Sequence, residues 1–323
     1  MNRTRVDRVV QEGSTLVKLD AEPINRNDLQ SADPLFLLIH GFTAHGTRLE
    51  QLGSRICAWC VNENSFPHAA AVVFNYNSFS GIEAAARTLG DRLLSYCPPT
   101  RDGASDISIL RNKIVILSHS MGGLVARQFA ARYSSLVKGV VMLGTPNDGV
   151  STDAMLDLLV TIAETVSDSP LPNLRVKSNL SRKQLTKKDG PPGRRLLDRL
   201  SSEWSGLPSR PRTMTISGAN PVLRLSSNAF FDSAINLKIQ RLMAGATNDG
   251  LVTELSVDMN ASVFTKTAPE YVHLNDYAEY HETNHSHLVD NEHLARLIYN
   301  WVLEGDLVRT RTMQPMHDQP DAA

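Results

Sequence analysis

Short runs dominated by apolar residues alternate with amphipathic segments along the first half of the chain. Four such runs occupy residues 34–39, 69–76, 113–117 and 137–143. Each run has the length and the aliphatic content of a strand that is buried on both faces. Segments 47–62 and 82–96 are predicted helices, and the second must end before Pro98-Pro99. Strands and helices in alternation predict an α/β fold, with a mostly parallel central sheet flanked by helices.

Weaker patterns extend this sheet toward both ends of the chain. Residues 6–10 and 15–19 flank a Glu-Gly-Ser turn and predict a hairpin of edge strands. Segments 212–218 and 270–280 predict two further strands. The length of 323 residues fits one α/β domain with an insertion.

The C-terminal part of the chain divides into a helix and a tail. Apolar residues recur at helical spacing within 288–303, which predicts a terminal helix that packs on the sheet. Residues 304–323 are polar, contain two prolines and predict a loose tail. We therefore expect a single domain over residues 1–303, followed by this tail.

Charge and cysteine content exclude several classes of protein. The 33 Lys and Arg residues balance 34 Asp and Glu residues, which argues against nucleic-acid binding as the main role. The N-terminus lacks the apolar core of a secretion signal, and no apolar run approaches the roughly 18 residues of a membrane span. Three cysteines make no disulfide framework, and Cys57 and Cys60 are expected to be buried thiols within one helix. These features predict a cytoplasmic location.

The pattern changes abruptly at Ser120. The preceding apolar run ends in Ser118-His119-Ser120-Met121-Gly122-Gly123, after which a helical pattern begins. A serine on such a strand-turn-helix stands above the carboxyl ends of the strands, beside the N–H groups of the new helix. The G-x-S-x-G pattern, with Ser118 in the first glycine position, is typical of a nucleophile elbow. The alternative is a serine that only caps the helix.

A second turn follows the apolar run 34–39. In serine hydrolases the loop after such a strand supplies one N–H donor for the tetrahedral oxyanion, and the residue after the nucleophile supplies the other. We assign these donors to Phe42 and Met121. The alternative is that this is only a tight turn, in which Gly41 is needed for backbone angles that other residues seldom adopt. His40 is interpreted as a structural histidine.

An orienting acid and a base should follow the nucleophile in the order Ser, Asp, His. Asp249 lies in an Asn-Asp-Gly turn that follows one more predicted strand than the competing Asp148, and it precedes a cluster of histidines at 281–287. We therefore favour Asp249 as the acid that holds the imidazole in one tautomer. Either aspartate could instead be only a turn residue.

No strand is visible between residues 151 and 210. Met155, Leu158 and Leu159 belong to an apolar stripe that predicts an amphipathic helix there, and nine basic residues lie between Arg175 and Arg199. We predict that 151–210 is a helical cap over the site, with an apolar face for an acyl chain and a basic part able to contact a lipid surface transiently. The alternative is a solvated loop with a helix packed permanently on the core.

Together these motifs resemble the bacterial triacylglycerol lipases of the α/β-hydrolase superfamily, and more loosely other lipase-like serine hydrolases. The resemblance spans roughly residues 34–303. It rests on His40-Gly41, Ser118 to Gly123, Leu143-Gly144-Thr145-Pro146, Ser217-Gly218, Asn248 to Val252, and Asn284-His285 followed by Leu288-Val289.

The resemblance also implies roles for the histidines. In that family the catalytic histidine follows an asparagine, which maps the base onto His285, with His287 as the fallback and His281 as a third choice. The family's calcium site commonly uses an aspartate two residues after this histidine. His287 occupies that position here, so no metal is expected.

These inferences predict a serine hydrolase that cleaves carboxylic esters through an acyl-enzyme, of the lipase, esterase or phospholipase type. Ser120, Asp249 and His285 form the predicted triad, and no cofactor is required. The alternatives are an acyltransferase, thioesterase or amidase with the same machinery, or a catalytically silent α/β-hydrolase fold that binds a partner.

Overall fold

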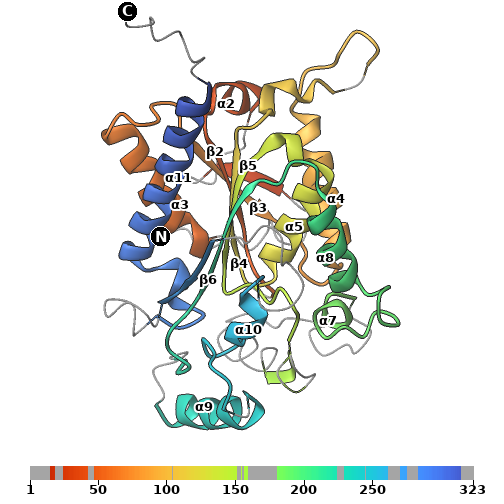
Figure 1. The fold of residues 1–323 in the computed structure, drawn as a ribbon, viewed down its shortest axis with the longest axis vertical. Helices are drawn as coiled ribbons and strands as arrows, with labels where there is room; N and C mark the ends of the chain where they lie inside the picture. The colour runs from red at the N-terminus through yellow and green to blue at the C-terminus, as the bar shows by residue number, and fades with distance from the viewer. Residues whose placement is uncertain are drawn as a thin grey trace, which may run out of the picture.

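A seven-stranded sheet forms the centre of the protein (Figure 1). The computed structural model describes residues 15–18, 25–42, 47–103, 105–150, 154, 156–158, 180–223, 229–243, 245–260, 270–274 and 283–313. The strands are β1 (Thr15–Lys18), β2 (Leu35–Ile39), β3 (Ala70–Asn75), β4 (Ile114–His119), β5 (Val137–Leu143), β6 (Arg212–Ser217) and β7 (Glu270–His273). Their order is β1-β3-β2-β4-β5-β6-β7. The six strands from β3 to β7 are parallel, and β1 is antiparallel to β3 at the edge.

The central strands are buried on both faces. Every residue of β2 is buried, and alternate side chains enter different cores: Leu35 and Leu37 face one side, whereas Phe36 and Leu38 face the other. Alternation of this kind follows from the two-residue period of a strand. The predicted α/β fold with a mostly parallel sheet is confirmed.

Helices cover both faces of the sheet (Figure 1). One face carries α2 (Arg26–Ser31), α4 (Ile82–Ser95), α5 (Gly122–Arg132) and α8 (Leu196–Gly206). The other face carries α3 (Thr47–Asn62) and α11 (Glu292–Met313). A smaller apolar cluster, which includes α9 (Ala229–Met243) and α10 (Glu254–Val257), lies outside these two cores.

The ends of the chain differ from the predicted elements. Strand β1 pairs with β3, and residues 6–10 of the predicted hairpin lie outside the described residues. Strand β7 ends at His273, and residues 275–280 of the predicted strand 270–280 are likewise outside the described part. Helix α11 continues to Met313 instead of ending at residue 303. The apolar stripe that predicts the helix ends at Val302, but backbone hydrogen bonding within a helix does not depend on apolar side chains and can continue beyond such a stripe.

The described part of 151–210 contains α7 (Leu180–Leu185) and α8, with helical backbone also at residues 154 and 156–158. Leu196, Leu200 and Trp204 of α8 are buried in the same core as α5, so this helix is a layer of the fold. Helix α7 caps α4, because Ser181 accepts from the Gly81 amide and Gln184 accepts from the Ile82 amide. Contact of the basic segment with a lipid surface stays a prediction.

None of the described helices is both long and apolar enough to cross a membrane.

Candidate active site

Ser120 occupies a sharp turn between β4 and α5. Its φ of +54° lies in the left-handed region, which residues other than glycine seldom adopt. The Ser120 amide donates to the Leu143 carbonyl of β5 (2.8 Å), which fixes the turn against the sheet. The small side chain of Ser118 is fully buried and donates to the Val141 carbonyl (2.9 Å). The predicted strand-turn-helix around Ser120 is therefore present.

Two glycines allow this turn to pack closely. A Cβ built on Gly122 would lie 2.3 Å from the Ile39 carbonyl oxygen and 2.5 Å from that of His40, whereas a Cβ on Gly123 would meet the Thr145 side chain at 2.0 Å. No side chain fits at either position without a backbone shift. Gly122 thus brings the start of α5 against the end of β2, and Gly123 brings it against Thr145, just after β5.

The Gly122→Ala substitution should lower the free energy of unfolding by about 2 kcal/mol or more, because the obstacle to the new methyl group is rigid backbone. Urea denaturation measures this effect. Gly206→Ala is the matched control, since nothing lies within 4 Å of its Cβ position in α8, and it should not lower stability. Equal stability of the two variants would contradict the packing argument.

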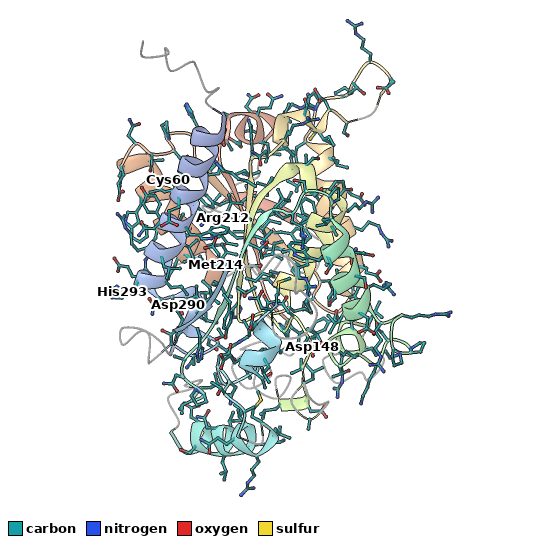
Figure 2. The ribbon with its side chains drawn as sticks, in the orientation of Figure 1. Cys60, Asp148, Arg212, Met214, Asp290 and His293 are labelled. Atoms are coloured by element: carbon teal, nitrogen blue, oxygen red, sulfur yellow. The ribbon has the colours of Figure 1, made fainter. Side chains whose placement is uncertain are left out.

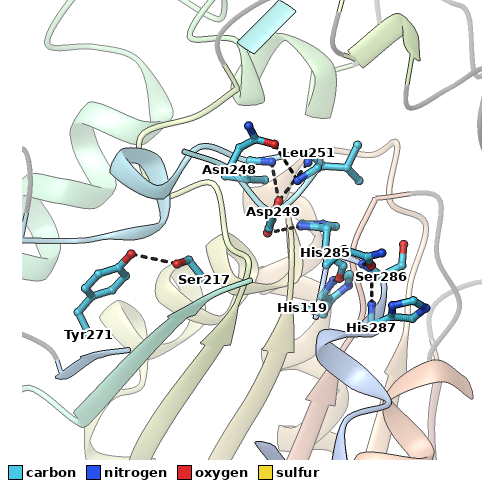
Figure 3. A network of polar contacts seen from close by, with 12 residues as sticks. His119, Ser217, Asn248, Asp249, Leu251, Tyr271, His285, Ser286 and His287 are labelled. Atoms are coloured by element: carbon cyan, nitrogen blue, oxygen red, sulfur yellow. Dashed lines mark hydrogen bonds and ion pairs between the residues drawn. The ribbon is translucent and has the colours of Figure 1, made fainter. Parts of the chain in front are cut away.

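Asp249 is a buried carboxylate with a full set of donors. It is 1% exposed, and its Oδ1 accepts from the amides of Leu251 (3.1 Å) and Val252 (2.8 Å). Gly250, with a φ of +99°, makes this tight turn possible. Oδ2 lies 2.8 Å from Nδ1 of His285 (Figure 3). All of these groups approach the two carboxylate oxygens, so the side chain is held in place as a hydrogen-bond acceptor.

His285 is held through both its backbone and its ring. It is 3% exposed, and its amide donates to the Asp249 carbonyl (2.8 Å). Since the Asp249 carboxylate accepts from Nδ1, that nitrogen carries the ring proton. In the neutral ring, Nε2 then has a free lone pair and can accept a proton.

A pocket joins these groups. Its lining includes Ser120, Met121, Phe42 and His285, from three separate segments of the chain, and it encloses about 290 Å³ with its open mouth included. The remaining lining residues are apolar: Pro146, Val150, Leu156, Leu185, Leu251 and Val252. A serine hydroxyl and an imidazole in one pocket with an apolar wall are compatible with acyl-transfer chemistry on a partly apolar substrate.

Comparison with known proteins agrees with this geometry. The sequence profile of the family described as "alpha/beta hydrolase fold" matches residues 110–277, just over half of the chain. The chain belongs to the α/β-hydrolase fold family. The profile of a family described as "putative serine esterase" matches residues 30–148 of this α/β-hydrolase, a span that contains Phe42 and Ser120.

One solved structure supports the fold, and another is a weaker likeness. The mature form of lipase BlEst2 from Bacillus licheniformis has a TM-score of 0.50 at 15% identity, covering 84% of this chain and 92% of its own. Phospholipase PlaB from Legionella pneumophila has a TM-score of 0.47 at 14% identity, covering 71% of this chain and 45% of its own. No curated protein sequence matches the chain.

The rival site residues of this α/β-hydrolase lie elsewhere. Asp148 is exposed and forms an ion pair with Lys187 near α7 (Figure 2), so it does not hold His285. His287 lies in the short 3₁₀ helix His287–Val289, where its amide donates to the Asn284 side chain (3.1 Å). His281 lies outside the described residues.

His40 has the surroundings of a structural histidine, as predicted. It is 3% exposed and stacks on Tyr76, with ring centroids 4.4 Å apart. Its Nε2 accepts from the Tyr76 amide (3.3 Å), and its carbonyl accepts from the Tyr76 hydroxyl (2.8 Å). These contacts position the strand end that leads to Gly41 and Phe42.

Sequence reasoning missed much of the pocket wall. Leu251 and Val252 directly follow the acid, and this adjacency is a signal that could have identified them. Leu185 lies at the end of α7, 65 positions after Ser120, and no local pattern marks it.

Cys57 and Cys60 are free thiols, and burial raises the pKa of each to about 12. Such thiols are poor nucleophiles and poor metal ligands at neutral pH. Among the described residues, no group of three or more His, Cys, Asp or Glu side chains is arranged to hold a metal ion.

Proposed function

We propose that this α/β-hydrolase cleaves carboxylic esters with Ser120 as nucleophile, His285 as general base and Asp249 as orienting acid. The observation that carries the proposal is the buried Asp249–His285 contact of 2.8 Å beside the pocket that Ser120 lines. It leaves Nε2 as the proton acceptor, in the tautomer that a serine hydrolase needs. The apolar wall of the pocket suits the acyl group of the ester.

The chemical steps follow from this assignment. The Ser120 oxygen attacks the acyl carbonyl while its proton passes to Nε2 of His285, and the Asp249 carboxylate stabilises the imidazolium. The amides of Phe42 and Met121 bind the oxyanion, each contributing on the order of 3 kcal/mol to lowering the barrier. Collapse releases the alcohol, which takes the proton from His285. Water then attacks the acyl-enzyme by the same route and releases the acid.

The same machinery could pass the acyl group to an alcohol or an amine, or accept a thioester, since the nucleophile chemistry is shared. Hydrolysis requires only water as the second substrate, which separates it from acyl transfer to an alcohol or an amine but not from cleavage of a thioester or an amide. A panel of 4-nitrophenyl esters of increasing acyl length, compared with a thioester and an amide of the same acid, measures this preference.

A fluorophosphonate probe tests the proposed nucleophile. We expect one covalent adduct, located by peptide mass spectrometry on Ser120, and no adduct in the Ser120→Ala variant. Circular dichroism establishes that the variant is folded. A folded wild-type protein that takes up no probe would instead support a catalytically silent binding protein, and an adduct on another serine would refute the assignment.

A further inference from the structure

His119, the residue directly before Ser120, bonds to the backbone of His285. Its Nε2 lies 2.8 Å from the His285 carbonyl oxygen, and the two ring centroids are 4.7 Å apart (Figure 3). A carbonyl oxygen can only accept, so Nε2 of His119 carries a proton and donates it. The side chain is 9% exposed, which keeps water from competing for the bond.

This bond links two parts of the site that are far apart in sequence. The other described bonds of His285 run to Asp249: its amide donates to the Asp249 carbonyl, and its ring contacts the carboxylate. These bonds hold the base to the loop that carries the acid. The His119 bond instead holds the base to β4, the strand on which the nucleophile stands.

We propose that His119 is a positioning residue that sets the distance and orientation between His285 and Ser120. The inference rests on the proposed function, because it assigns His119 no contact with substrate. A misplacement of about 1 Å between a nucleophile and its base can cost on the order of 100-fold in rate. The hydrogen bond from His119, the residue next to the nucleophile, restricts movement of His285 relative to Ser120.

The segment that carries His285 is anchored independently of His119. The Thr283 carbonyl accepts from the amides of Ala219 (2.8 Å) and Asn220 (3.1 Å), and the Asn284 side chain donates to the Val222 carbonyl (2.8 Å). Loss of the His119 donor should therefore leave the segment folded but allow His285 to shift relative to Ser120. A positioning role predicts a loss of turnover with little loss of stability.

A pair of variants separates the donor from the volume of the side chain. His119→Gln keeps an N–H donor near the position of Nε2, whereas His119→Met keeps a similar volume without a donor. With a soluble 4-nitrophenyl ester, we expect His119→Met to lower kcat by 10- to 100-fold with KM within about twofold of wild type. His119→Gln should recover kcat to within about fivefold of wild type. The rate of fluorophosphonate labelling should fall and recover in parallel.

Each outcome decides one question. Wild-type kcat in His119→Met, equal losses in both variants, or a loss confined to KM would overturn the positioning role. Should His119→Met fail to fold, His119→Asn replaces it, because its amide is too short to reach the Nε2 position and should give the same loss. Wild-type protein that neither labels nor hydrolyses the ester would refute the proposed function itself.

Discussion

The His285→Ala variant is expected to lose ester hydrolysis by a factor on the order of 10⁴ to 10⁶ in kcat, with KM little changed. The ring is the proton acceptor for Ser120 and later the donor to the leaving alcohol, so both halves of the reaction fail without it. Its amide and carbonyl bonds to Asp249 and His119 are retained in the variant, which should therefore fold. Steady-state kinetics with a soluble ester measures the loss.

His287→Ala is the matched control for this prediction. The structure shows a backbone bond from His287 to Asn284, and that bond survives the substitution. We expect kcat within about threefold of wild type. An active His285→Ala protein together with an inactive His287→Ala protein would reverse the assignment of the base.

The second large effect is expected from Asp249→Asn, which should lower kcat by about 10⁴-fold. The Leu251 and Val252 amides require an acceptor, so the carbonyl oxygen of the new side chain faces them and its NH₂ group faces His285. Two donors would then meet at Nδ1. The ring proton must then move to Nε2. Protonated Nε2 can no longer accept a proton from Ser120.

Asp148→Asn controls for the loss of an acidic side chain. This substitution removes a partly exposed ion pair with Lys187, whose contribution to stability is within about 1 kcal/mol, and the Asp148 charge that favours the protonated form of the buried Arg127. Its kcat should match that of wild type. Comparable losses in the two aspartate variants would show that charge, and not the orientation of His285, accounts for the effect.

Patterns local in sequence predicted most of the elements correctly. The apolar runs of β2 and β4 identify strands without reference to other parts of the chain, since burial on both faces requires apolar residues at every position. The turn at Ser120 is recognisable from the local pattern of an apolar run, a serine, two glycines and a helix, although the contacts that demand those glycines are tertiary. Helix α8 was not predicted, because the apolar stripe identified in 151–210 lies around Met155, Leu158 and Leu159, well before Leu196.

The sequence by itself determined the alternation of strands and helices, the serine between a strand and a helix and the aspartate in its glycine turn, because each is recognised from residues a few positions away. Only the tertiary structure decided which histidine meets Asp249, that Leu185 lines the pocket and that His119 bonds to the His285 carbonyl across 166 positions. Contacts of that kind depend on how the loops fold over the ends of the strands. Their geometry is set by packing among distant segments, and no periodicity along the chain records it.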